Sequence, residues 1–437
     1  MLKVVETFSG IGSQAKALKN ANIEHEILCT VDWDINAIIA YDLIHNGTQD
    51  LSKYENVTKE QLLDRLKNYT LSTCGKKPAS EKALKALSEE TLKRLVCAID
   101  RSKNLVSITD VKGIDLPNQI DLLTYSFPCQ DLSVAGHWHG NTGGIDRDAH
   151  NRSGMLWEVE RILKERKQCN LGLPRFLLME NVSNILSSKH KKNFDEWKNY
   201  LEEIGYYNKV YVLDSSNFGI PQKRIRAYMV SVLVGKDEIK RQQVDKYFNE
   251  HSLDNNEYVS KLNIKVKDLS DFLKLDYKNA QYLAEADACR PNNTVSRKDI
   301  YRDNEKLVID GKVATTFVPT ITTKQDRHPN SGVIDYKTET QTKCGFRYLT
   351  PRECFLLMGF DEKDYQNIIE SDFQTHGKKF FTFEKLNKMA GNSIVVNVLE
   401  EIFKQIEYIQ QTIFEPEKKL SLKDVMELDA DTYQIIK

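Results

Sequence analysis

A cysteine beside a proline, just beyond an apolar run, is the feature of this sequence best suited to chemistry. Residues 120–125 form the run, and Pro128 and Cys129 follow it. An open α/β sheet binds its ligands at the carboxyl ends of its strands. A thiol attacks only as its thiolate, so Cys129 would need a nearby positive charge, helix N-terminus or base. The alternative is a buried structural cysteine, because free cysteines are among the most buried residues.

An acid and two arginines are expected at the same edge of the sheet. Glu180 directly follows the apolar residues 176–179, and Arg224 and Arg226 precede the next apolar run. The alternation along a strand lets Arg224 and Arg226 project in one direction. A thiol, a carboxyl group and guanidinium groups at one edge suit nucleophilic attack on a pyrimidine ring.

A second group of residues suggests a cofactor pocket. Gly10 and Gly12 follow the first predicted strand, and Asp32, Trp33 and Asp110 follow later apolar runs. An acid after the second strand can bind a ribose diol, and an indole can stack on adenine. Each acid could instead belong to a turn or helix cap. The glycine loop lacks the third glycine of a dinucleotide site, which favours a ligand without pyrophosphate such as S-adenosylmethionine.

The elements that must position these residues follow one pattern. Short apolar runs alternate with helical patterns, which predicts an α/β fold with a mostly parallel sheet covered on both faces. The predicted strands are residues 3–8, 27–31, 120–125, 176–179, 206–213 and 228–234.

Composition divides the chain into a larger and a smaller domain. Residues 1–234 are predicted to form the first domain, interrupted by a helical insertion at 46–103 in which Ser88 is a plausible N-cap. The polar, weakly periodic residues 235–345, with short β-like pieces such as residues 313–321, predict a second domain. Residues 346–437 contain an apolar helical pattern at 395–406 that should return to the first domain. The insertion could support the sheet or contact a partner.

Composition places loose limits on the class of protein. The 437 residues exceed what one hydrophobic core usually supports, and the 62 basic and 63 acidic residues nearly cancel. Eight scattered cysteines without a CxxC pair speak against a disulfide scaffold and a metal site. No apolar run approaches the ~20 residues of a membrane span. These features predict a cytoplasmic protein that binds no metal and no membrane.

Six motifs in this order closely resemble the cytosine-C5 methyltransferases. They are FSGIG, SFPCQDLS, ENV, QKRIR, RYLTPRE and AGNS, and they extend from Phe8 to Ser393. The resemblance implies a Rossmann-like S-adenosylmethionine-dependent methyltransferase fold with a smaller inserted target-recognition domain. It also implies a DNA (cytosine-5)-methyltransferase that protects DNA in a restriction-modification system.

The resemblance assigns roles to the catalytic residues. Cys129 would add to cytosine C6, which makes C5 able to accept a methyl group. Glu180, protonated or strongly hydrogen-bonding, would stabilise the charge that develops at N3, which requires a raised pKa. Arg226 would contact O2, with Arg224 supporting the same pocket. The sequence names no base for the C5 proton, and water could serve. Because a paired base cannot reach Cys129, the cytosine must flip out of the duplex.

The resemblance also predicts the residues that hold the cofactor. They are Phe8, Gly10, Ile11, Gly12, Asp32, Trp33, Asp110, Val111, Pro128, Asn392 and Ser393. Asp32 stands where the family often has glutamate, whose reach is longer.

Two segments are expected to contact DNA. The glycine-rich segment 131–152 reads as a mobile loop, and Ser133 and Arg152 match positions of the family loop that closes over DNA, with Gln130 beside them. Within residues 235–345, Thr323, Lys324, Gln325 and Arg327 carry side chains suited to base edges and phosphates, although an ordinary polar turn is the alternative.

Three other functions compete with the DNA methyltransferase interpretation. A tRNA cytosine methyltransferase would use the same cysteine and cofactor, but the sizeable segment before RYLTPRE favours double-stranded DNA. A silent DNA-binding subunit is disfavoured by intact Cys129, Glu180 and Arg226, and a nucleotide-dependent dehydrogenase by the short glycine loop. The front half also resembles mollicute enzymes that modify CG, but their recognition regions differ and that specificity is not transferred. A monomer is expected, and whether a cognate restriction endonuclease acts separately stays open.

Overall fold

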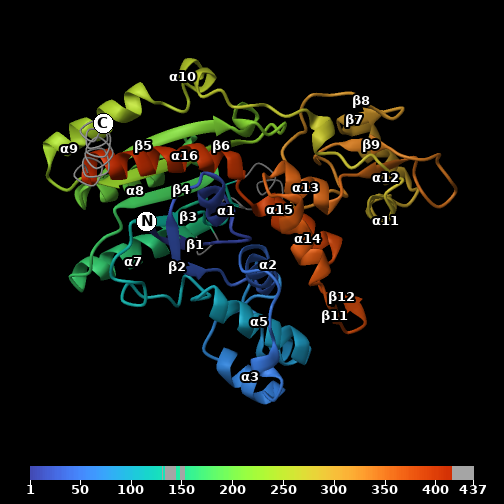
Figure 1. Ribbon diagram of the computed structural model, residues 1–437, viewed down its shortest axis with the longest axis horizontal. Coiled ribbons are helices and arrows are strands. Elements are labelled where there is room, and N and C mark those ends of the chain that lie inside the picture. The colour runs from blue at the N-terminus through green and yellow to red at the C-terminus, as the bar shows by residue number, and fades with distance from the viewer. Residues whose placement is uncertain (130, 133–143, 148–152, 416–437) are drawn as a thin grey trace, which may run out of the picture.

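A six-stranded sheet forms the centre of the larger part of the protein (Figure 1). The computed structural model describes residues 1–129, 131–132, 144–147 and 153–415. The strands are β1 (Leu2–Thr7), β2 (His25–Val31), β3 (Leu122–Tyr125), β4 (Phe176–Val182), β5 (Tyr206–Asp214) and β6 (Ile225–Leu233). Their order is β2-β1-β3-β4-β6-β5, and only the pairings of β6 with β4 and β5 are antiparallel. The predicted α/β fold with a mostly parallel sheet is therefore confirmed.

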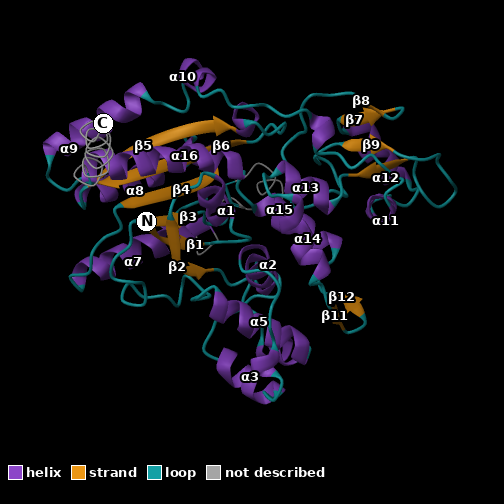
Figure 2. Cartoon of the chain, viewed as in Figure 1, coloured by secondary structure: helices purple, strands orange, loops and turns teal. Residues whose placement is uncertain are grey.

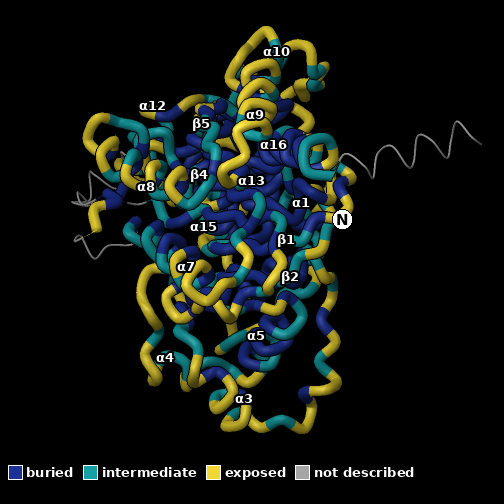
Figure 3. Tube along the Cα trace, turned by 90° about the vertical axis from the view of Figure 1, so that its left-hand side faces the viewer, coloured by how far each residue is buried: buried dark blue, intermediate teal, exposed yellow. Residues whose placement is uncertain are grey.

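Helices cover both faces of this sheet, because successive side chains of a strand point to opposite faces. Leu122 belongs to a core that includes residues of α1, α2 and α16, whereas its neighbour Leu123 belongs to a core that includes residues of α7 and α8. These helices are α1 (Ser13–Asn20), α2 (Ile35–His45), α7 (Leu156–Gln168), α8 (Lys191–Glu203) and α16 (Val396–Ile409). The tube in Figure 3 shows buried residues along the strands and the inner helices.

The segment predicted as a helical insertion contains α3 (Lys59–Leu66), α4 (Glu81–Lys85) and α5 (Glu89–Arg101) (Figure 2). The Ser88 side chain accepts a hydrogen bond from the Thr91 amide, which confirms the predicted N-cap. The apolar residues at helical spacing, Leu92 to Ile99, are buried. Helix α5 packs against both α2 and α3, so the insertion is joined to the sheet through α2.

A smaller sheet lies apart from the large one (Figure 1). It contains β7 (Lys306–Ile309), β8 (Lys312–Val313), β9 (Val333–Asp335) and β10 (Phe346–Tyr348) in the order β10-β9-β7-β8. Helices α11 (Ala280–Ala288) and α12 (Val295–Asp303) accompany it, whereas α9 (Glu238–Glu250) packs against β5 and is followed by α10 (Asn256–Lys261). The β-like piece expected at 313–321 contributes only its first residue to β8, and Val318 forms an isolated bridge with Gln222.

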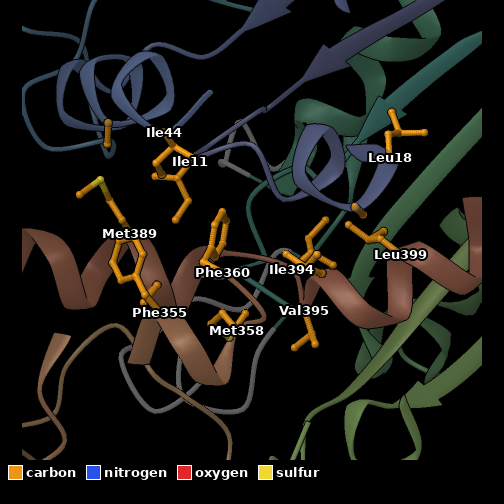
Figure 4. Packing of buried hydrophobic residues seen from close by; sticks show 14 of the residues in the cluster. Ile11, Leu18, Ile44, Phe355, Met358, Phe360, Met389, Ile394, Val395 and Leu399 are labelled. Atoms are coloured by element: carbon orange, nitrogen blue, oxygen red, sulfur yellow. The ribbon is translucent and has the colours of Figure 1, made fainter. Parts of the chain in front are cut away.

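The last described part of the chain returns to the large sheet. It comprises α13 (Pro351–Leu357), α14 (Glu362–Glu370), the hairpin β11 (Gln374–Thr375) and β12 (Lys378–Lys379), α15 (Phe383–Asn392) and α16. Figure 4 shows Ile394, Val395 and Leu399 beside Leu18 of α1, with Ile11 close by. The apolar pattern predicted at 395–406 is thus the buried face of α16. Within the described ranges no helix is long and apolar enough to cross a bilayer.

A buried ion pair joins β10 to α13. The guanidinium of Arg347 donates two hydrogen bonds to the Glu353 carboxylate, each 2.8 Å long, and both side chains have no exposed surface. Glu353 also accepts from the Thr350 amide and completes a capping box at the start of α13. The cation and these amides together hold the pKa of Glu353 below its usual value despite burial. Its charge is therefore fully compensated.

We predict that Arg347→Met lowers the free energy of unfolding by about 3–5 kcal/mol, because the buried Glu353 loses its counter-charge. Urea denaturation followed by circular dichroism measures the change. Lys404→Met removes an exposed partner of Glu401 and serves as the control, with an expected change within about 0.5 kcal/mol. An Arg347→Met variant as stable as the wild type would contradict the prediction.

Candidate active site

One cavity of about 630 Å³ lies at the carboxyl ends of β1 to β4. Most of the residues predicted for catalysis and cofactor binding line it, namely Phe8, Gly10, Ile11, Asp32, Trp33, Pro128, Cys129, Glu180, Arg224, Arg226, Asn392 and Ser393. They come from both ends of the sequence because parallel strands direct their carboxyl ends to one edge. The predicted thiol, acid and arginines therefore share a cavity with the glycine loop.

The backbone before Cys129 is held by side chains of two other segments. Asn181 Nδ2 donates to the Phe127 carbonyl at 3.0 Å, and Ser153 Oγ donates to the Pro128 carbonyl at 2.7 Å. Burial raises the pKa of the Cys129 thiol, and the positive charge of Arg226 opposes this shift. Formation of the thiolate thus depends on nearby positive charge.

Glu180 and Arg226 face each other across neighbouring strands. Their closest atoms, Glu180 Oε1 and Arg226 Nε, are 3.5 Å apart, and both side chains are mostly buried. Burial raises the pKa of the Glu180 carboxyl group, although the charges of Arg226 and Arg224 pull it down. This environment favours the protonated form of Glu180 more than water does.

Arg224 connects three segments at the edge of the cavity. Its guanidinium donates to the carbonyls of Ile321, Gly391 and Ser393 at 2.9, 3.1 and 2.8 Å. Burial and the neighbouring charge of Arg226 lower the pKa of Arg224 to about 9. Its Nε is buried and has no hydrogen-bond partner among the described residues, so one donor is left over. Arg224 is therefore a structural link as well as a cavity residue.

The glycine loop after β1 is fixed by Asp32. The Gly10 amide donates to Asp32 Oδ2 and the Asp34 amide donates to Oδ1, both at 2.9 Å. Phe8 and Gly10 adopt positive φ angles of 54° and 55°, which bend the chain sharply at the cavity. Burial raises the pKa of Asp32 to about 6. Its shorter side chain thus also acts as an acceptor for the loop.

Comparison with known proteins identifies the family of this chain. The sequence pattern of the C-5 cytosine-specific DNA methylases matches residues 71–408. The chain belongs to this family. It is 35% identical over 416 residues to the orphan methyltransferase M.SssI of Spiroplasma monobiae, covering 93% of this chain and 97% of that one. It is 32% identical over 409 residues to the type II methyltransferase M2.ScrFI of Lactococcus lactis subsp. cremoris, covering 93% and 99%.

Solved structures show the same fold at low sequence identity. The S. pombe Dnmt2 methyltransferase gives a TM-score of 0.56 at 18% identity over 94% of this chain and 99% of that one. A putative DNA modification methyltransferase encoded within a prophage of E. coli gives 0.50 at 16% identity over 94% and 100%. The protein is therefore a DNA (cytosine-5)-methyltransferase of the restriction-modification type with the methyltransferase fold expected from its motifs. The dehydrogenase alternative is excluded.

Three predicted cofactor residues of the methylase do not line the cavity. Gly12 caps α1 instead, and its φ of 80° places its α-carbon against the side chains of His45 and Tyr41. Asp110 is exposed and accepts a hydrogen bond from the Thr70 amide, while Val111 is buried in the core with α7. Asp110 and Val111 thus lie directly after the lining residues 106–109, and Asp110 bonds to Thr70, which also lines the cavity.

Other residues of the methylase line the cavity without having been predicted. They include residues 106–109, directly before Asp110, as well as four residues of 70–78, Asp34 and Lys388. Ser107 and Thr109 follow an apolar pair and could have been considered with Asp110. Nothing in the sequence marks residues 70–78, because they lie in the insertion and their proximity depends on the fold.

The predicted DNA contacts have different fates. Gln130, Ser133 and Arg152 lie outside the described residues. The side chains of Lys324 and Arg327 are exposed, and that of Thr323 is half-buried. Gln325 is buried, and its amide nitrogen donates to the Thr322 carbonyl and Ser331 Oγ. Gln325 thus stabilises its own loop in this conformation.

We predict that Gly12→Ala destabilises the cofactor-free methylase by about 2 kcal/mol or more, through overpacking and an unfavourable positive φ. An added β-carbon would lie 2.1 Å from His45 Nε2. Gly10→Ala is the matched control, since nothing lies within 4 Å of its added carbon, and only the positive φ costs about 1 kcal/mol. Thermal unfolding of both variants measures the difference. Equal melting temperatures would contradict this account of Gly12.

Proposed function

We propose that this methylase transfers a methyl group from S-adenosylmethionine to C5 of a cytosine flipped out of a specific duplex DNA sequence. The reaction would proceed through a temporary bond between Cys129 Sγ and cytosine C6. The observation that carries the proposal is that Cys129, Glu180 and Arg226 line the same cavity as the Gly10 loop. One cavity can thus bring a methyl donor and a base together.

The cavity fits the proposed cofactor in size and in chemistry. Its volume of about 630 Å³ lies within the range of small-molecule sites, and no atom lies within 4 Å of a β-carbon built on Gly10. Asp32 offers carboxylate oxygens for a ribose diol and Trp33 an indole for adenine, with Phe8, Ile11, Pro128, Asn392 and Ser393 completing the proposed site. When bound, S-adenosylmethionine supplies an electrophilic methyl group on a sulfonium. Asp110 is the proposed partner of the adenine amino group, because it lies between the lining residues 106–109 and the lining residue Thr70.

The catalytic residues overcome the low nucleophilicity of cytosine C5. The Cys129 thiolate adds to C6. The π electrons of the C5=C6 double bond shift to C5, and the negative charge is shared with N3 through C4. Protonated Glu180 donates to N3 as negative charge develops there, which its raised pKa permits. Arg226 lowers the pKa of the thiol and contacts O2, and Arg224 Nε is the spare donor beside it. After C5 has accepted the methyl group, its proton leaves to water and the thiolate departs, which restores the ring.

DNA would meet this cavity with its target base outside the helix. Glu180 and Arg226 are mostly buried, so a stacked base cannot reach them and flipping costs a few kcal/mol. We assign target recognition to the small sheet with α11 and α12, where Thr323, Lys324 and Arg327 are the proposed contacts. Gln130, Ser133 and Arg152 are proposed to contact DNA around the flipped base. Gln325 would contact DNA only after releasing its present partners.

The names of the relatives suggest a cellular role for this methylase. A type II methyltransferase and an orphan methyltransferase are both among the relatives, so both a restriction partner and solitary action agree with the family. We propose that the enzyme acts as a cytoplasmic monomer that marks host DNA against cleavage.

We predict that expression in a bacterium free of cytosine methylation, followed by bisulfite sequencing, reveals 5-methylcytosine within one short sequence. Cys129→Ser should reduce this methylation by about a thousandfold or more, because a hydroxyl is a far weaker nucleophile than a thiolate. Cys169→Ser, at an exposed cysteine away from the cavity, is the matched control and should keep full activity. Unmethylated host DNA, or an active Cys129→Ser enzyme, would refute the proposed function.

We predict a covalent complex when duplex DNA carries 5-fluorocytosine at the target position. Fluorine at C5 cannot leave as a proton, so the thiolate cannot be expelled after methyl transfer. Denaturing gel electrophoresis should show one shifted band that requires cofactor and is missing for Cys129→Ser. Turnover of normal DNA without any shifted band would show that the reaction does not pass through Cys129 addition.

A further inference from the structure

The helical insertion contributes directly to the cofactor cavity, although its sequence offers no role for it. Thr70, Gly75, Lys76 and Pro78 line the cavity beside the residues that follow β2. We call residues 70–78 the wall segment. Helix α5 of the insertion packs on α2 and α3, and the segment between α4 and α5 bonds to the β11–β12 hairpin. The wall segment is therefore the part of the insertion that reaches the site.

The wall segment is docked on the residues around Trp33. The Ser72 amide donates to the Trp33 carbonyl at 2.8 Å, and the Ile35 amide donates to the Ser72 carbonyl at 3.0 Å. Ser72 Oγ accepts from the Gly75 amide at 2.9 Å and donates to the Lys77 carbonyl at 2.6 Å. These bonds close a turn around one hydroxyl, and the turn is paired with the backbone on both sides of the cavity residue Asp34.

A lysine from a distant helix completes this docking. Lys388 of α15 donates from Nζ to Asp34 Oδ2 at 2.7 Å and to the Cys74 carbonyl at 2.5 Å. Asp34 is mostly buried, with 13% of its side chain exposed, so the ammonium also neutralises a carboxylate with little access to water. One cation thus joins the end of β2, the wall segment and α15.

The fit around this cation is tight at Gly75. A β-carbon on Gly75 would lie 2.5 Å from Asp34 Oδ2 and 2.8 Å from Lys388 Nζ, and the residue has a positive φ of 64°. The backbone of the wall segment therefore approaches the ion pair as closely as a residue without a side chain allows. Such contact leaves little freedom for the wall segment while Lys388 is in place.

Helix α15 links the wall segment to the opposite side of the site. Its last residue, Asn392, and the following Ser393 line the cavity, and Gly391 lies against the backbone of Thr322 and Thr323. Lys388 is one turn earlier on the same helix. The hydrogen bonds of Lys388 therefore join the wall segment to the helix that carries Asn392.

We infer that residues 70–78 form a wall of the cofactor cavity and that Lys388 is a positioning residue which holds this wall against α15. The inference rests on the proposed use of S-adenosylmethionine and goes beyond it. It gives the insertion a function in cofactor retention. It also predicts that cofactor affinity depends on a side chain that belongs to neither the glycine loop nor the catalytic group.

The test measures binding of S-adenosylhomocysteine to the full-length protein by isothermal titration calorimetry. Lys388→Met should raise the dissociation constant about tenfold or more, the usual consequence of losing a charged hydrogen-bond donor. The same variant should raise KM for S-adenosylmethionine by a larger factor than it lowers kcat at saturating cofactor, because Lys388 bonds to the wall segment and not to Cys129, Glu180 or Arg226. Lys388→Arg, which keeps the cation and donors, should recover most of the affinity.

Two further variants separate positioning from direct contact and from general damage. Ser72→Ala removes the hydroxyl that closes the turn but leaves Lys388 in place, and Ser72 itself does not line the cavity. It should also weaken binding if the wall segment matters. Lys385→Met is the matched control on α15, because Lys385 donates to the Phe380 carbonyl and not to the wall segment, and its affinity should match the wild type.

Hydrogen exchange gives a readout that needs neither ligand nor activity. Amides of residues 73–77 should exchange faster in Lys388→Met than in Lys385→Met. Wild-type affinity in both Lys388→Met and Ser72→Ala, or unchanged exchange, would overturn the inference while leaving the proposed function intact. A wild-type protein that binds no S-adenosylhomocysteine would instead overturn the proposed cofactor, and the inference with it.

Discussion

The buried guanidinium of Arg224 is the interaction on which the arrangement of the site most depends. It donates to the carbonyl of Ile321 and to those of Gly391 and Ser393, which belong to two segments far from Arg224 and from each other in sequence. A buried carbonyl without a partner costs free energy comparable to a lost hydrogen bond. The backbone at Ile321, the end of α15 and the residue before β6 are therefore held at one point beside the cavity.

Burial raises the pKa of both proposed catalytic groups, which favours the proposed role of one and opposes that of the other. Burial raises the pKa of Glu180, which suits a carboxyl group that must donate a hydrogen bond. Burial also raises the pKa of Cys129, which works against the thiolate. Arg226 carries the charge that opposes both shifts, and its Nε lies 3.5 Å from Glu180 Oε1. The site thus balances an acid that should keep its proton against a thiol that should lose it.

The predictable parts of the fold were those controlled by local pattern. The strands and the amphipathic helices α5 and α16 follow from apolar spacing, and the Ser88 cap from a hydroxyl before a helical pattern. The position of α9 on the large sheet was not predicted, because the weak apolar periodicity of its sequence does not indicate which surface the helix covers. The strand expected at 313–321 shrank to a short hairpin edge and one bridge, since a strand forms only where a partner is available.

By itself, the sequence determined the family: the ordered motifs around Cys129, Glu180 and the glycine loop are those of the cytosine-C5 methyltransferases. Only the tertiary structure decided which neighbours complete the site. It placed Ser107 in the cavity lining, put Gly12 at the helix cap, and brought Lys388 to the wall segment. The physical reason is that motif residues follow strand ends, whose common edge is set by parallel pairing. Contacts such as that of Lys388 depend on how separate helices pack, which no local spacing records.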